Sequence, residues 1–423
     1  MESRTAQPQL TVHDRGVLRD LAWRRRALSQ LPVMAERREL WRRVASLKAE
    51  RPLVLTELRE APDDLVPVAE LRCREGWARD VERQWRLELV HDNVDDDYVF
   101  EPFVACPWQI SISDYGVAPT RRRAASDHGR GAEAWDAPLG NLEGDFDRLK
   151  PRVFTVDRDA TEAHVRLMEE VVGGILSVRR RGVYWWSMGL TWSAIDLIGL
   201  EGLMYALLDN PAGVRRLMAF LGDDQRALLD WLEREELLSL NNENDSLASG
   251  TLGYTDELPG PGRSATAPVR TGDLWGFAES QETVGVSPRL FAELILPWQL
   301  PLLARFGLTY YGCCEPLHER WPALAAIPNL RRVSVSPWCD QARMAAALED
   351  RYVFCRKPHP ALVSCDVFDE EAIRADLRQT LQVAQGCQVE LSLKDVHTLR
   401  GHPERMRRWV ELARESIDMH WRG

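Results

Sequence analysis

Two adjacent thiols are the first feature of the sequence that could do chemistry. Cys313 and Cys314 follow a short apolar run and precede an acidic residue. Zinc binds thiolates, imidazoles and carboxylates in a tetrahedral shell, so two neighbouring thiols could supply part of its ligand set. A nearby cation, Lys357 or Arg356, could instead lower the pKa of one thiol and make it a nucleophile. The third interpretation is two small side chains packed at the rim of a barrel.

A second polar set follows the last apolar run of the chain. Asp395 and His397 alternate there with Lys394, so a continuing strand would put the carboxylate and the imidazole on one face. They could complete a metal site, or the carboxylate could orient the imidazole as a base. A salt-bridged surface loop is the alternative. The zinc ligands predicted from both sets are Cys313, Cys314, Asp395 and His397.

Further polar clusters follow other apolar runs. Glu279 and Glu282 could act as acid and base, or bind amines of a substrate. Arg356 and Lys357 offer two fixed cations that would suit a carboxylate or a phosphate, unless they form a solvated surface cluster. The catalytic residues predicted from these clusters and the preceding one are Glu279, Glu282, Lys357 and His397.

Tryptophan is unusually common, with sixteen residues in the chain. The adjacent pair Trp185 and Trp186, and Trp338 close to a predicted strand end, suggest a large cavity with aromatic walls, although such rings also simply fill cores. The substrate-binding residues predicted from these rings and from polar strand ends are Trp185, Trp186, Asn241, Trp338, Arg356 and His359.

Elements that could position these residues recur along the chain. Short apolar segments alternate with amphipathic runs of helical length, a pattern typical of repeated βα units. The predicted strands are 99–104, 183–187, 237–241, 274–278, 308–312, 332–335, 352–355 and 389–393. Eight strands with intervening helices favour an α/β fold of the (β/α)8 TIM-barrel type, whose active site lies where the strands end. A doubly wound open sheet is the alternative, but the first strand lacks a glycine-rich phosphate turn after it.

The barrel is predicted to occupy residues 96–423, after an N-terminal helical extension over residues 1–95. Leucines at helical spacing support that extension, and it carries no catalytic motif. Residues 107–150 show little periodicity, which indicates an irregular loop or a lid over the active site.

Composition narrows the choice of partners and compartment. A net charge of −11 argues against nucleic acid as a partner. No apolar stretch is long enough to span a membrane, and the first residues lack the apolar core of a secretion signal. Eight cysteines without regular spacing indicate reduced thiols. We therefore expect a cytoplasmic protein with a small-molecule substrate.

From about residue 183 onward the chain resembles the uroporphyrinogen decarboxylase superfamily. The matching pieces are short: Asp209-Asn210-Pro211, Val286-Ser287-Pro288-Arg289-Leu290-Phe291, Leu296-Pro297-Trp298, the cysteine-bearing strand end and Gly401-His402-Pro403-Glu404-Arg405. The resemblance implies a TIM barrel, often a homodimer. Members of this superfamily are decarboxylases that use no metal, or methyltransferases that move a methyl group from a corrinoid or folate to a thiol held on zinc.

The chain departs from both branches. It lacks the Arg-Gln-Ala-Gly-Arg segment with which the decarboxylases grip substrate carboxylates. Cys313 matches the first zinc-ligating cysteine of the methyltransferases, but Tyr311 stands where their histidine would be, and the last strand is not followed by a cysteine. The resemblance therefore points to a divergent subgroup with a Gly-Cys-Cys-Glu-Pro motif.

These observations lead to three expectations about function. The first is a zinc-dependent methyltransferase that moves a methyl group from a corrinoid, carried by a partner protein, or from a folate to a small thiol. The second is a lyase or decarboxylase that acts on a carboxylated small molecule. The third is a non-catalytic protein that binds a tetrapyrrole.

Overall fold

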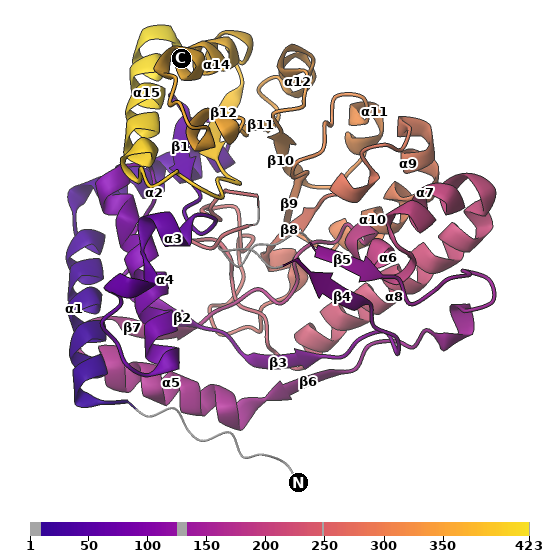
Figure 1. The fold of residues 1–423 in the computed structure, drawn as a ribbon, viewed down its shortest axis with the longest axis horizontal. Helices are drawn as coiled ribbons and strands as arrows, with labels where there is room; N and C mark the ends of the chain where they lie inside the picture. The colour runs from indigo at the N-terminus through magenta and orange to yellow at the C-terminus, as the bar shows by residue number, and fades with distance from the viewer. Residues whose placement is uncertain (1–9, 125–132, 248, 423) are drawn as a thin grey trace.

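A parallel sheet of six strands is the centre of the molecule (Figure 1). The computed structural model describes residues 10–124, 133–247 and 249–422. Along the sheet the strands follow the order β1-β12-β11-β10-β9-β8, and every neighbouring pair is parallel. Their bounds are β1 Leu53–Thr56, β8 Trp275–Ala278, β9 Leu308–Tyr311, β10 Leu330–Val335, β11 Val353–Arg356 and β12 Gln388–Leu393.

Five predicted strands lie in this sheet as β8 to β12. Nearly every residue in them is buried, which explains why they read as continuous apolar runs. Helices separate them in the chain and cover the outer side of the arc of strands (Figure 1). The main helices are α9 Pro288–Leu294, α10 Leu296–Leu303, α12 Gln341–Leu348, α14 Glu370–Val383 and α15 Glu404–His420. The alternating βα pattern is therefore confirmed over the second half of the chain.

Two predicted strands are wrong. Residues 183–187 and 237–241 lie beside the sheet without forming strands. A side chain takes the place of a ladder: the Asn241 amide donates to the Trp275 carbonyl at 3.1 Å and accepts from the Trp275 N–H at 2.9 Å. On β8, the Phe277 carbonyl accepts from the Met188 N–H at 2.8 Å. Apolar patterning finds buried segments. It does not distinguish a strand that pairs with the sheet edge from a segment that binds the edge through a side chain or a single backbone bond.

Residues 10–95 are helical for most of their length and also contain a strand. Their main helices are α1 Val12–Ser29, α2 Pro32–Ala45 and α4 Gly76–Val94. Between α2 and α4, β1 pairs with β12, with Leu53 opposite Glu390. Residues 1–95 therefore supply an edge of the central sheet. The predicted strand 99–104 is shifted to β2, Phe103–Cys106, which pairs in parallel with β7, Ser177–Arg180.

The predicted irregular loop, residues 107–150, carries more structure than expected. β3 (Gln109–Ile112) pairs with β6 (Phe154–Asp157), and β4 (Thr120–Arg123) pairs with β5 (Glu133–Asp136), both antiparallel. The β4–β5 ribbon is fastened to α6, Thr191–Ile198, by the Trp135 indole N–H, which donates to the Ile195 carbonyl at 3.0 Å. β4 and β5 were not predicted because their side chains are mostly exposed and charged, so they lack the apolar alternation that indicates a strand. Residues 125–132 of the predicted lid lie outside the described part.

No single helix in the described ranges combines the length and apolar character needed to cross a membrane. Only the pair α6 and α7 (Leu200–Asp209), bent by 98° at their junction, meets that test when the two are joined.

One stretch of chain, residues 249–254, lies against the inner face of the sheet. Five side chains from β8, β9, β10 and β12 hold it. Four of them donate to its backbone carbonyls: Tyr310 to Ser249 (3.3 Å), Ser392 to Gly250 (2.6 Å), Arg332 to Leu252 (2.9 Å) and Trp275 to Gly253 (2.9 Å). The fifth, Glu390, accepts from the Thr251 hydroxyl at 2.8 Å. This inner segment fills space that apolar side chains would otherwise occupy.

A buried ion pair lies under the inner segment. Arg332 Nε is 2.9 Å from Glu390 Oε1, and their side chains are 0% and 2% exposed. The guanidinium also lies over the Trp275 ring at 4.6 Å, and the Cys355 thiol is 3.3 Å from the other Glu390 oxygen. Because β10 carries the arginine and β12 the glutamate, the pair ties strands on either side of β11.

Removal of one charge from this pair should destabilise the fold. Glu390→Gln would leave the buried Arg332 guanidinium without a counter-charge, which should cost about 3–5 kcal/mol in the free energy of unfolding. Urea denaturation measures it. The matched control is Glu39→Gln, at the exposed pair with Arg43, which should cost less than about 1 kcal/mol. Equal costs for the two variants would contradict the role given to the buried pair.

Candidate active site

The polar residues singled out from the sequence follow strands that run in parallel, so they lie at one edge of the sheet. Glu279 follows β8, Cys313 follows β9, Lys357 follows β11 and Lys394 follows β12. The turn after β9 requires Gly312: its φ is +98°, and a Cβ there would lie 2.6 Å from the Leu317 side chain. This glycine directs the chain into the two cysteines.

The centre of the site is a cluster of two thiols, an ammonium and a carboxylate. Cys313 Sγ is 3.6 Å from Cys314 Sγ and 3.3 Å from Lys394 Nζ. Cys314 Sγ is 3.4 Å from Asp395 Oδ2, which itself lies 3.3 Å from Lys394 Nζ. We call these four residues the thiol cluster. Cys313 and Lys394 are buried, whereas Cys314 is partly exposed.

The thiol cluster favours a thiolate on Cys313. A hydrogen bond from Cys314, together with the positive charge of Lys394 and against the effect of burial, lowers the pKa of Cys313 to about 7. The same hydrogen bond, with burial, raises the pKa of Cys314 far above its usual range. Burial opposes the charge on Lys394, but the nearby acidic groups, with Cys313 the strongest among them, together outweigh it and raise the pKa of Lys394. The arrangement is a thiolate–ammonium pair with a neutral thiol beside it.

The four predicted zinc ligands are not all brought together. Cys313, Cys314 and Asp395 lie in the thiol cluster, but the His397 side chain is 62% exposed and lies 3.3 Å from Glu60. No group of three or more His, Cys, Asp or Glu side chains in the described part of the chain is placed to hold a metal ion. A zinc ion bound by both sulfurs would also lie beside the buried ammonium. The side chains therefore do not fit the predicted metal.

Strand alternation explains why Tyr311 does not replace the missing histidine. Its hydroxyl donates to Gln299 Oε1 at 3.0 Å and lies 3.1 Å from Ser280 Oγ, outside the thiol cluster. Its neighbour Tyr310 faces the inner segment instead. Successive residues of a strand point to opposite faces, so only one of the two tyrosines can reach the interior.

Three carboxyl groups lie behind Cys313. Glu315 accepts from the Cys313 N–H at 2.9 Å and from the Ser280 N–H at 2.9 Å. Glu279 accepts from the Gln281 N–H at 3.0 Å, while its other oxygen is buried without a hydrogen-bond partner. Burial, and then the nearby charges of Glu282 and Glu315, raise the pKa of Glu279 well above its usual value. Glu279 therefore holds a proton close to the thiolate.

The two predicted cations on β11 separate because they alternate across the strand. Arg356 points outward, 2.8 Å from Asp376 on α14, and is not placed to bind a ligand at the strand ends. Lys357 points inward, where its Nζ is buried without a hydrogen-bond partner, 5.8 Å above the Tyr310 ring. Burial lowers the pKa of Lys357. The prediction that both bind one anion is therefore wrong for Arg356.

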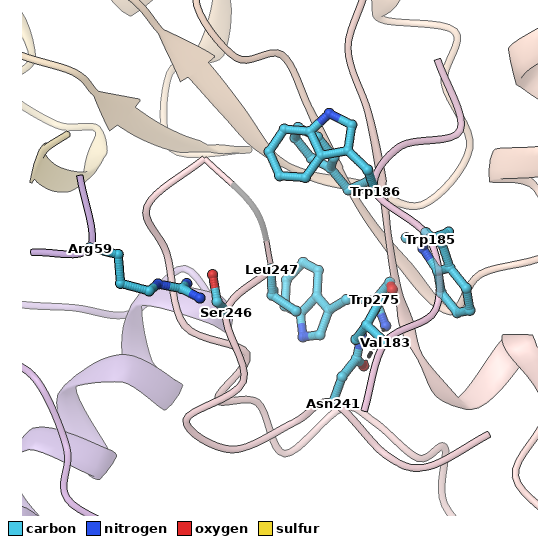
Figure 2. Close-up of a pocket in the computed structure, with 10 residues that line it drawn as sticks. Arg59, Val183, Trp185, Trp186, Asn241, Ser246, Leu247 and Trp275 are labelled. Atoms are coloured by element: carbon cyan, nitrogen blue, oxygen red, sulfur yellow. Dashed lines mark hydrogen bonds between the residues drawn. The ribbon is translucent and has the colours of Figure 1, made fainter. Parts of the chain in front are cut away.

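Aromatic side chains line a cavity, but it is small rather than large as predicted. The cavity has a volume of about 200 Å³, and Trp185, Trp186 and Asn241 line it together with Trp275. Figure 2 shows Arg59 on the side opposite Trp185. Trp338 does not line this cavity: its side chain is 61% exposed and packs edge-on against the His359 ring at 5.1 Å.

A larger cavity adjoins the small one. It has a volume of about 990 Å³ and shares Arg59, Val183 and Ser246 with its neighbour. Thr56 and Gly250 also line it, and Gly250 accepts from Ser392, two residues before Lys394 on the inner face of β12. None of the four residues of the thiol cluster lines either cavity, so the link described between them is the Ser392–Gly250 hydrogen bond beside Lys394.

Arg59 was missed at the sequence level. It follows β1 by three residues, and a strand-end search would have found it if β1 had been recognised. The signal was the four-residue apolar run Leu53–Thr56 behind a proline, which the surrounding helical pattern obscured. Lys394 was noted only as the alternate face of Asp395 and His397. Nothing in the sequence says that it would reach a cysteine 81 residues away.

The thiolate on Cys313 predicts its alkylation behaviour. Iodoacetamide reacts with the thiolate form, so the rate at Cys313 should rise with pH around a midpoint of about 7. Peptide mass spectrometry reports each cysteine separately. Cys355, which is fully buried with a strongly raised pKa, serves as an internal control and should stay unmodified in the folded chain. A midpoint for Cys313 at or above the usual thiol value of about 8.5 would contradict this assignment.

Glu279→Gln should change how stability depends on pH. A carboxyl group with a raised pKa in the folded chain stabilises it at low pH, and this contribution is lost as pH rises through the folded-state pKa. The variant removes that loss, so it should be more stable than the wild type in alkaline buffer and nearly equal at about pH 4. Thermal unfolding measures it, with the exposed Glu293→Gln as control. If Glu279→Gln is instead less stable than the wild type in alkaline buffer, the folded chain favours the ionised carboxylate and the pKa of Glu279 is not raised.

Comparisons with known proteins give a fold but no family. No family model matched the chain, and a search of curated proteins found no match. Among 17 matching solved chains is a methyltransferase from Methanosarcina mazei, with a TM-score of 0.50, 10% identity, and coverage of 89% of this chain and 97% of that chain. At this identity the likeness concerns architecture alone: the chain shares the mixed α/β fold of that methyltransferase.

Proposed function

We propose that the chain is methyltransferase-like and moves a methyl group from a donor to the thiolate of its own Cys313. The observation that carries this proposal is the 3.3 Å contact between Cys313 Sγ and the buried Lys394 ammonium at the carboxyl end of β9. A thiolate is the reactive form of a thiol, and a neighbouring cation makes it available near neutral pH. The architecture shared with a methyltransferase is compatible with this proposal.

We also propose that the sheet closes into a (β/α)8 barrel. On the open side of the sheet, a series of contacts runs from β1 to β8 through the segments between them and supports closure. Asp97 N–H donates to the Val54 carbonyl at 2.8 Å, β2 pairs with β7, Gly182 N–H donates to Ser239 at 3.0 Å, and Asn241 binds the β8 backbone. In a closed barrel the strand ends form one mouth, which would gather the thiol cluster and the cavities at a single site.

The methyl donor in this proposal is a folate, or a corrinoid carried by a partner protein; when bound, it would supply an electrophilic methyl group. The cavities fit the flat ring system and anionic tail of a folate. Trp185 and Trp186 offer aromatic surface, Arg59 offers a positive charge, and the larger cavity of about 990 Å³ is at the upper end of the usual size for small ligands.

The residues of the chain would then divide the chemistry. The Cys313 sulfur forms a bond to the methyl carbon, while the bond between that carbon and the donor breaks and its electron pair leaves with the donor. The thiolate form of Cys313 reacts, and the lowered pKa of about 7 makes this form available at neutral pH without a separate base. Glu279 holds a proton close by, which it could give to a leaving nitrogen. The tryptophan side chains would exclude water from the transfer.

A second candidate function is a lyase that acts on a carboxylated small molecule. The specific observation in its favour is Arg59, an exposed cation at the junction of the two cavities. There the guanidinium could bind a substrate carboxylate, and Glu279 could deliver the proton that replaces carbon dioxide. This reaction would not need Cys313.

Methyl transfer is tested with methyltetrahydrofolate and, separately, methylcobalamin added anaerobically to the full chain. We expect the Cys313 peptide to gain one methyl group, and in the cobalamin arm the absorbance of the methylated form should fall. Cys313→Ser should abolish both signals, whereas Cys365→Ser, at an exposed thiol away from the site, should keep them. If neither donor methylates the wild type, or if Cys313→Ser behaves as the wild type does, the proposal fails and the lyase becomes the better candidate.

A further inference from the structure

The thiol cluster has a positive charge at its centre, supplied by the chain. Lys394 Nζ lies 3.3 Å from Cys313 Sγ and 3.3 Å from Asp395 Oδ2, and its side chain is almost fully buried. β12 fixes this position. Glu390, Ser392 and Lys394 succeed one another on its inner face, and the first two are held by Thr251 and Gly250 of the inner segment.

We infer that the Lys394 ammonium takes the place of a metal ion at this site, so that the chain keeps Cys313 as a thiolate without a metal. This inference rests on the proposed function only in one respect, namely that the thiolate serves as a sulfur nucleophile. The contact itself is independent of which group the sulfur attacks. Lys394 is on this view a positioning residue, because it acts on the reaction through Cys313.

The donor set argues against a metal on three counts. Zinc would need four ligands, with bonds of about 2.3 Å to each sulfur. The oxygen that could join the sulfurs, Asp395 Oδ2, already pairs with the ammonium, and His397 is turned toward Glu60. An ion bound by Cys313 would lie next to a buried positive charge, and repulsion between charges is strong where water is scarce.

Charge balance favours the ammonium. The titratable groups that face Cys313 are Cys314, Glu315, Lys394, Glu279, Lys357 and Tyr310. Lys394 is the one among them in direct contact as a cation, since burial favours the neutral form of Lys357. The ammonium already faces two anions, the Cys313 thiolate and the Asp395 carboxylate, and a metal ion at the same place would add its own positive charge beside the buried ammonium.

The experiment compares alkylation of Cys313 with iodoacetamide, followed by peptide mass spectrometry across pH, in three variants of the full chain. Lys394→Met removes the charge and keeps most of the stem. Lys394→Arg keeps the charge. Asp395→Asn removes the carboxylate that a metal would use but that the ammonium does not need. Each protein is measured before and after extensive treatment with a zinc chelator, its zinc content is determined, and its circular dichroism reports folding.

If the inference is right, chelation leaves the wild-type profile unchanged. Lys394→Met moves the midpoint up by about one pH unit, from about 7 to about 8, which lowers the rate at pH 7 about fivefold. Lys394→Arg stays close to the wild type, and Asp395→Asn keeps or increases the rate.

The inference is overturned if chelation slows the wild type as Lys394→Met does, if Asp395→Asn loses the reactivity, or if folded Lys394→Met keeps the wild-type profile. Should Lys394→Met fail to fold, the chelation and Asp395→Asn arms still decide. None of these measurements uses a methyl donor. A reactive Cys313 that accepts no methyl group would therefore sink the proposed function and leave this inference standing.

Discussion

The ion pair between Arg332 and Glu390 is the interaction on which the interior depends. Two buried full charges depend on each other for stability, and this pair also binds the inner segment through the Leu252 carbonyl and Thr251. The segment in turn brings Gly250 against Ser392, two residues before Lys394. The ammonium that contacts Cys313 thus stands at the end of a chain of contacts that begins at the buried pair.

Alternation along the strands decides which polar residues can meet. On β12 it puts Lys394 inside, and on β11 it puts Lys357 inside and Arg356 outside, against Asp376. On β9 it separates Tyr310 from Tyr311. The site is therefore built from inward-facing positions of neighbouring strands, and residues adjacent in the sequence serve different layers of the molecule.

The sequence was sufficient for the parts of the fold that follow a simple period. Strands β8 to β12 and the helices between them were predicted because buried parallel strands are apolar on both faces. β1 was missed because four residues make a weak signal inside a helical region. Residues 237–241 form a buried apolar run like that of a strand, but the Asn241 side chain binds the β8 backbone there in place of ladder bonds. At the site, the cysteines were found by type and spacing. The contact between Cys313 and Lys394 could not be predicted, because it depends on how β9 and β12 are placed in the sheet, which no local sequence pattern indicates.

The inner segment has a consequence for how the sequence can change. An ordinary barrel interior can exchange one apolar side chain for another with little cost, since no bond is broken. Here carbonyls of residues 249, 250, 252 and 253 each depend on a donor from a different side chain, spread over four strands. An apolar replacement at Tyr310, Ser392 or Trp275 would leave a carbonyl buried and unsatisfied. Side chains of the interior can therefore change only together with the inner segment that they bind. Single substitutions toward an apolar core would each be destabilising.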